Sequence, residues 1–92
     1  MVPVHPGRIL RRELATRELS ANKLALALRV PSGRITSILN GKRAISPDTA
    51  LRLARYFGNS AQFWMNLQTR FDLLVAEREL GKRIKAEVNN AA

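Results

Sequence analysis

Cysteine is absent from this chain of 92 residues, and histidine occurs only once. Without a thiol the chain forms neither a disulfide nor a thiolate metal site, and a single histidine leaves little for zinc to bind. Acidic residues are scarce as well, and Glu77 and Glu79 are too close in sequence to face each other as a catalytic carboxylate pair on a helix. We therefore expect no metal, no cofactor and no enzymatic activity.

Long apolar runs are also missing, so the sequence predicts no transmembrane helix. The first seven residues lack the basic and apolar stretches of a secretory signal, which favours a cytoplasmic protein. Alternating strand-like patterns do not occur, whereas helical spacing of apolar residues recurs along the chain. The expected fold class is all-α, with five helices.

The charge of the chain is strongly positive and unevenly placed. Sixteen Lys and Arg residues stand against seven Asp and Glu, a net charge of +9. Residues 1–59 hold 11 basic and three acidic residues, a balance of +8, whereas residues 60–92 hold five and four, a balance of +1. The first two-thirds of the chain should therefore meet a polyanion, for which nucleic acid is the first candidate and an anionic membrane the second.

Helix starts are marked by residues that satisfy free backbone N–H groups. Pro6 suits the first turn of a helix, and Ser20, Ser32, Ser46 and Ser60 are good N-caps for four more. His5, directly before the first helix, is expected to cap it or pack against it.

Helix ends are marked by Pro31, Gly41 and Gly58, and Gly81 is a further possible stop. The fifth helix is read as residues 61–78. The domain is accordingly predicted to cover residues 1–78. Residues 79–92 would form a C-terminal extension, partly helical and then frayed.

The second and third helices form the informative pair, because a tight turn joins them as in a helix-turn-helix unit. Ile35, Ile38 and Leu39 give the third helix one buried side, and at 100° per residue Gly33, Ser37 and Asn40 point away from it. Arg34 and Thr36 lie on the flanks. Such a small polar face can enter the DNA major groove, which is about 12 Å wide. Any solvated helical bundle can show this pattern, and so can a module that binds an acidic protein.

Sequence resemblance separates these alternatives. The segment "SANKLALALRVPSGRITSILNG" resembles the Xre and phage-repressor helix-turn-helix family. The stretch from His5 to Leu74, through "HPGRIL", "LNGKRAISPDTALRLARYFG" and "SAQFWMNLQTRFDL", resembles the HigA antitoxin branch of that family, also called the virulence-associated protein I or addiction-module antidote branch. The resemblance implies a five-helix, lambda-repressor-like domain with an extended C-terminal helix.

The resemblance and the outward face of the third helix together assign the site residues. Contacts with base edges are expected from Ser32, Arg34, Thr36 and Ser37. Contacts with the DNA backbone are expected from Ser20, Asn22, Lys23, Asn40, Lys42 and Arg43.

Two positions depart from the family pattern. Arg29 stands where the family has glycine, so it must adopt a left-handed conformation or the turn must differ. Pro31-Ser32 replaces the usual Ser-Pro, so Ser32 could be consumed as a cap instead of contacting a base.

The aromatic and apolar residues of the fifth helix offer more apolar area than we expect so small a core to bury. We expect Phe63, Trp64, Leu67 and Phe71 to form the interface of a homodimer that reads a palindromic operator. The resemblance implies an antitoxin that represses its own operon and neutralises an mRNA-cleaving, RelE-like toxin of the HigB type. The alternative is a stand-alone Xre-type repressor with no toxin partner.

Overall fold

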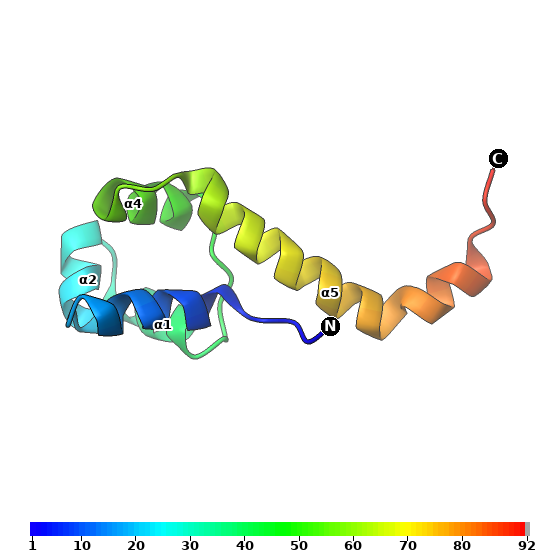
Figure 1. Ribbon diagram of the computed structural model, residues 1–92, viewed down its shortest axis with the longest axis horizontal. Coiled ribbons are helices and arrows are strands. Elements are labelled where there is room, and N and C mark those ends of the chain that lie inside the picture. Colours follow the sequence, from blue (N-terminus) through cyan, green and yellow to red (C-terminus); the bar gives the residue numbers. More distant parts are fainter. Residues whose placement is uncertain (92) are drawn as a thin grey trace.

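In the computed structural model, which describes residues 1–91, the chain forms five α-helices and no strands. They are α1 (Pro6–Thr16), α2 (Ala21–Leu28), α3 (Ser32–Leu39), α4 (Pro47–Phe57) and α5 (Ala61–Glu87). Helices α1 to α4 and the first part of α5 gather into a body, and the rest of α5 projects from it (Figure 1). The all-α fold expected from the sequence is confirmed.

Most helix starts follow the side-chain caps that the sequence indicates. The hydroxyls of Ser20, Ser46 and Ser60 accept backbone N–H groups at the starts of α2, α4 and α5. His5 caps α1, because its Nδ1 accepts the N–H of Gly7 at 2.9 Å, and its ring packs edge-on against Phe71. These caps satisfy donors that the first turn of a helix leaves free.

Two helix boundaries differ from the sequence prediction. Helix α3 begins after Pro31, which provides no side-chain cap, so Ser32 is the first helical residue and its hydroxyl is not used as the cap. Helix α5 runs through Gly81 to Glu87, across the expected boundary at residues 78 and 79. A helical glycine costs only about 1 kcal/mol relative to alanine, which a long helix tolerates. The chain is not helical over residues 88–91, and Ala92, the last residue of the tail expected to fray, lies outside the described residues.

The core lies where the first four helices meet the start of α5. Its buried apolar members are Leu10, Leu14, Leu24, Ala25, Leu28, Ile35, Ile38, Ile45, Ala50, Leu53 and Trp64. The largest of them, Trp64, is completely buried, and its Nε1 donates to the Oδ1 of Asn59 at 2.9 Å. Trp64 therefore offers no surface to a second subunit, and the expectation that it lies in a dimer interface is wrong. Burial against α4 gives the indole more apolar contact than an exposed position on α5 could.

Candidate nucleic-acid interface

Helix α3 is held against α1 by three contacts. In α1, Gly7 lies so close to the carbonyl of Ile38 that a Cβ at this position would overlap it. The Nη2 of Arg11 donates to the Leu39 carbonyl at 3.2 Å and to Asn40 Oδ1 at 3.3 Å, at the end of α3. The sequence reading missed Arg11, because nothing local distinguishes it from Arg8 or Arg12.

The turn between α2 and α3 takes the left-handed form that its position requires. Arg29 has φ 61° and ψ 44°, so it adopts the left-handed conformation. This is the position at which the family pattern has glycine. Its backbone N–H bonds back to the carbonyls of Ala25 and Leu26 and closes α2. A non-glycine residue in this conformation costs about 1–2 kcal/mol. The turn therefore keeps its usual geometry at an energetic cost.

The base-contacting candidates occupy the first two turns of α3. Ser32, Gly33 and Thr36 are exposed, whereas Ser37 is half-buried. The Thr36 hydroxyl donates to the Ser32 carbonyl at 3.1 Å, so its oxygen remains available as an acceptor. The exposed face is therefore rotated slightly from the expected one, toward Thr36 and away from Ser37.

The backbone-contacting candidates surround this face and keep free donors after their internal hydrogen bonds. Asn22, Lys23, Lys42 and Arg43 are exposed. The Ser20 oxygen accepts the N–H of Lys23 at 3.1 Å, which leaves its O–H as a donor.

Asn40 behaves in the same way, because its Oδ1 accepts from Arg11 and its amide NH₂ remains a donor. Donors and cations are the groups that bind phosphate oxygens, so the rim of α3 is suited to a nucleic-acid backbone.

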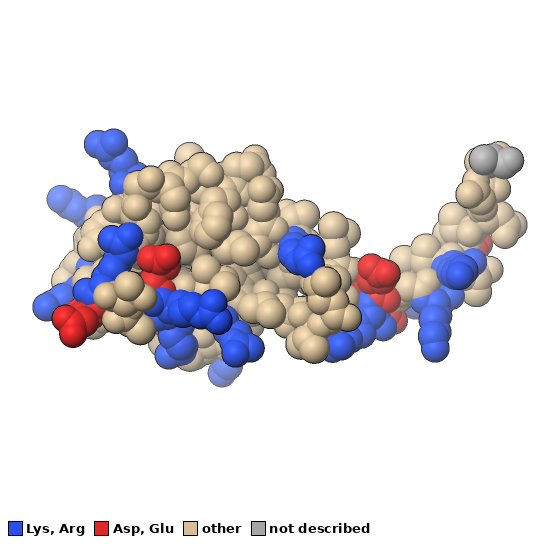
Figure 2. All heavy atoms as spheres, viewed as in Figure 1, with Lys and Arg blue, Asp and Glu red and all other residues tan. Residues whose placement is uncertain are grey.

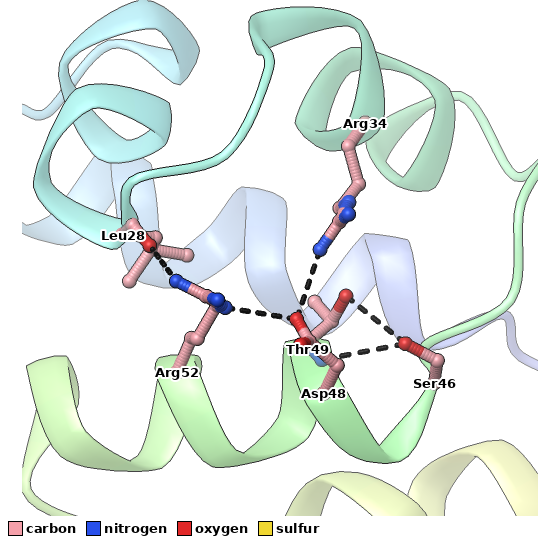
Figure 3. A network of polar contacts seen from close by, with 6 residues as sticks. All are labelled: Leu28, Arg34, Ser46, Asp48, Thr49 and Arg52. Carbon is pink, nitrogen blue, oxygen red and sulfur yellow. Dashed lines mark hydrogen bonds and ion pairs between the residues drawn. The ribbon is translucent and has the colours of Figure 1, made fainter.

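Arg34 is the exception among the candidates. Its Nη1 donates to the Oδ1 of Asp48 at 3.0 Å, and the side chain is only 24% exposed. The Nε of Arg52 donates to the same Oδ1 at 2.8 Å, and the Nη1 of Arg52 donates to the Leu28 carbonyl at 2.8 Å (Figure 3). Asp48 thus joins α4 to the start of α3, and Arg52 joins α4 to the end of α2.

Hydrogen bonds keep this carboxylate charged. The bond from Arg52, with a smaller effect from Arg34, holds the pKa of Asp48 below its ordinary value. The first turn of α4 adds a positive dipole end that favours the same ionised form. The sequence did not single out Asp48 as a site residue, because its partner Arg34 lies 14 positions away and Arg52 lies one helical turn away.

A second polar contact missed by the sequence reading fixes the loop after α3. Gln68 in α5 is buried, its Oε1 accepts the N–H of Ile45 at 2.8 Å, and its Nε2 donates to Asp72 at 2.9 Å. The loop that carries Lys42 and Arg43 is therefore tied to α5 at its far end. A glutamine inside the apolar stripe of a predicted helix is the signal that could have found it.

Basic side chains dominate the surface around the helical body. In Figure 2 they gather along α1 and at the end of the body near α2, with a few red acidic atoms among them, and red and blue atoms also lie side by side along the projecting part of α5. The distribution agrees with the balance of +8 over residues 1–59. No helix in residues 1–91 is long and apolar enough to cross a membrane. No group of three metal-ligating side chains occurs within the same residues.

A family model described as Helix-turn-helix matches residues 10–64, which include α2, α3 and α4. The chain belongs to the helix-turn-helix family. Virulence-associated protein I of Dichelobacter nodosus is 52% identical over 80 residues, which cover 86% of this chain and 74% of that protein. The resemblance found in the sequence is confirmed.

Two solved structures of HigA-branch proteins have the same architecture along their whole length. The HigA-family addiction module antidote of Coxiella burnetii is 49% identical, with a TM-score of 0.95 over 98% of this chain and 99% of that one. The antitoxin HigA of Pseudomonas aeruginosa, solved with the higBA promoter, is 44% identical, with a TM-score of 0.96 over 99% and 100%. Within its family the chain therefore belongs to the HigA branch, and the long α5 is part of the architecture that these proteins share.

Proposed function

We propose that this protein is a DNA-binding antitoxin that represses its own operon, with α3 lying in the major groove of a palindromic operator. The observation that carries the proposal is the exposed polar face of α3, surrounded by free donors and cations on α2 and on the loop after α3. The Pseudomonas aeruginosa relative with the same fold was solved with promoter DNA, which supports the same role here. Repression of an operon would take place in the cytoplasm.

Salt dependence tests the DNA-binding part. Each neutralised phosphate contributes about −0.9 to the slope of log K against log salt concentration, so several contacts should give a steep negative slope. Replacing Lys42 by alanine should reduce the steepness by about 1.

Arg83→Ala is the matched control, because Arg83 lies in the projecting part of α5 and pairs with Glu87 at 3.0 Å. This variant should leave the slope unchanged. A wild-type slope near zero would refute nucleic-acid binding.

We further propose that a homodimer forms through α5. Of the residues expected at the interface, Trp64 is excluded, Leu67 and Phe71 are half-buried, and Phe63 remains 42% exposed. The projecting part of the helix adds Leu73, Leu80 and Ile84 as exposed apolar residues. A helix arm with exposed apolar side chains gains stability when a second copy covers it. A two-fold dimer would also place two α3 helices on successive half-sites of a palindrome, about 34 Å apart.

Sedimentation tests the dimer without disturbing the core. The double substitution of Leu80 and Ile84 by serine should shift the mass toward the monomer, while the melting of the helical body measured through Trp64 fluorescence changes little. Arg78→Ser on the same arm is the control. A wild-type protein that stays monomeric at high micromolar concentration contradicts the proposal.

The toxin partner is the finer part of the proposal and follows from the HigA branch. A HigB-type toxin cleaves mRNA and is expected to be basic, so it should dock where acids are free. Within residues 1–91, Glu18, Glu77 and Glu79 form no ion pair, and all three are exposed. They lie just after α1 and on the projecting part of α5, away from α3. A complex of toxin, antitoxin and DNA should therefore be possible.

Co-expression with the neighbouring reading frame tests this part. The two products should co-purify, and expression of the neighbour alone should arrest growth. If the neighbour is harmless and does not co-purify, the protein is a stand-alone repressor, which is the second candidate function.

A further inference from the structure

The side chain of Arg34 does not extend freely from the recognition helix. Arg34 is the third residue of α3, and its guanidinium turns toward the start of α4, where Nη1 meets Asp48 (Figure 3). Its Nε is buried and has no hydrogen-bond partner within the described chain. A guanidinium offers five N–H donors in a rigid fork. With one N–H of Nη1 engaged and Nε buried, the second N–H of Nη1 and both N–H groups of Nη2 are what remain for a ligand.

Asp48 is itself held by a second arginine. Its Oδ1 also accepts from Arg52, and Arg52 is anchored on the carbonyl of Leu28, the last residue of α2. Two cations and one helix end therefore determine where this carboxylate lies. Its side chain remains 57% exposed, at the edge of the surface where α3 would meet DNA.

We propose that Asp48 is a specificity-determining positioning residue, which sets the direction from which Arg34 reaches a base edge without contacting that base itself. The inference rests on the proposed DNA binding. The base preference expected from Arg34 in α3 would then depend on Asp48 in α4 as well.

The physical reason is the competition between bases and phosphates for a cation. An untethered arginine has many rotamers and can bind any nearby phosphate, a contact that carries no sequence information. A bidentate contact with guanine requires the fork to arrive in the right plane. A carboxylate held beside the guanidinium restricts its rotamers and repels phosphates that approach the same place.

Arg52 keeps this arrangement intact when Arg34 engages a base. If the Arg34 contact lengthens, Asp48 still retains the shorter bond to Arg52, so no carboxylate is left unpaired. An unpaired charge at the interface would otherwise oppose binding. The Arg34–Asp48 contact can therefore lengthen when Arg34 binds a base, while Arg52 still holds Asp48 in place.

The experiment measures base preference, not affinity alone. The wild-type protein first selects short duplexes from a randomised pool, and each base pair of the enriched duplex is then substituted. Dissociation constants are measured for the wild type, Asp48→Asn, Arg34→Ala and the double variant. Glu13→Gln is the matched control, because Glu13 is a carboxylate paired with Arg17 at 3.3 Å on α1.

Asp48→Asn should bind scrambled duplexes more tightly and should lose about fivefold or more of its discrimination at one base pair. Arg34→Ala should lose discrimination at the same base pair, and adding Asp48→Asn to it should remove no more. Glu13→Gln removes the same charge and should leave discrimination unchanged. Asp48→Glu, which keeps the charge and moves it, should keep scrambled binding weak and still alter preference at that base pair.

Four outcomes overturn the inference. Asp48→Asn could change the enriched and scrambled duplexes by one factor, which would reduce Asp48 to a general charge. The loss could persist in the Arg34→Ala background, which would separate Asp48 from Arg34. If the wild type enriches no duplex, the proposed function fails together with the inference. If the wild type discriminates between base pairs and Asp48→Asn discriminates equally well, the inference alone is wrong.

Discussion

Gly7 in α1 lies directly against the carbonyl of Ile38 in α3, with no room for a side chain between them. The contact joins the first helix of the domain to the helix proposed to enter the major groove. It allows α1 and α3 to pack at a short distance from each other. Glycine at position 7 is therefore required by packing between helices, in addition to its place in the first turn.

Gly7→Ala should destabilise the fold by about 1–3 kcal/mol, because the added methyl group forces α1 and α3 apart. Chemical denaturation measures the change. Gly33→Ala is the matched control, since nothing lies within 4 Å of a Cβ at Gly33 in α3. That substitution should stabilise the helix by up to about 1 kcal/mol. Equal stability of the two variants would contradict the close packing of α1 on α3.

Arg29→Gly should raise the free energy of unfolding relative to Arg29→Ala by about 1 kcal/mol, because glycine adopts the left-handed conformation without strain. Both variants remove the same charge, so the difference between them isolates the backbone. Thermal or urea unfolding of the pair measures it. If alanine proves as stable as glycine, the turn does not carry the strain that φ 61° implies.

Trp64→Ala should cost about 3–5 kcal/mol, since it empties the largest buried side chain of the core and leaves Asn59 without its donor. For a domain of this size that is a large part of the total stability. Loss of helical circular dichroism at moderate temperature would show it.

Phe63→Ala, at the neighbouring but half-exposed aromatic residue, is the control and should unfold at a higher temperature than Trp64→Ala. A stable Trp64→Ala protein would indicate that the indole is not part of the core.

Stability should fall as the pH decreases from 7.5 toward 5, through the single histidine. Burial lowers the pKa of His5, although Asp72 and the backbone of Arg43 oppose this shift. The unfolded chain, with a histidine pKa of about 6.5, therefore binds the proton first as the pH falls. His5 consequently contributes stability that is complete above pH 6.5 and is lost as the pH falls toward its lower folded value.

Melting temperatures across this pH range, compared with His5→Asn, provide the measurement. Asparagine can still accept the Gly7 N–H as an N-cap but does not titrate. The variant should therefore show a flatter curve between pH 7.5 and 5. Parallel curves for the two proteins would show that another group is responsible for the pH dependence.

Most of the secondary structure could be predicted from local residues. The serine caps at 20, 46 and 60 and the glycine at 58 act within one turn of the helix they begin or end, so their effect is visible in the sequence. The inward positions Leu10, Leu24 and Ile35 follow from helical spacing in the same way. Gly81 was a possible helix end in the sequence, but α5 continues through it, because a helical glycine carries only a weak local penalty and does not end a helix of 27 residues.

The roles of side chains that connect two helices could not be predicted in this way. Whether Trp64 lies in the core or in an interface depends on the angle at which α5 crosses α4, and no local pattern fixes that angle. The partners of Asp48 and Gln68 are likewise decided by helices that meet only after folding.

The sequence by itself thus determined the helices, the basic half of the chain and the family, because caps, spacing and charge are properties of neighbouring residues. Only the tertiary structure decided which polar side chains remain free at the proposed DNA surface. The reason is physical: a side chain is free or engaged according to what lies within hydrogen-bond distance of it. For Arg34 that neighbour is a carboxylate 14 residues further along the chain.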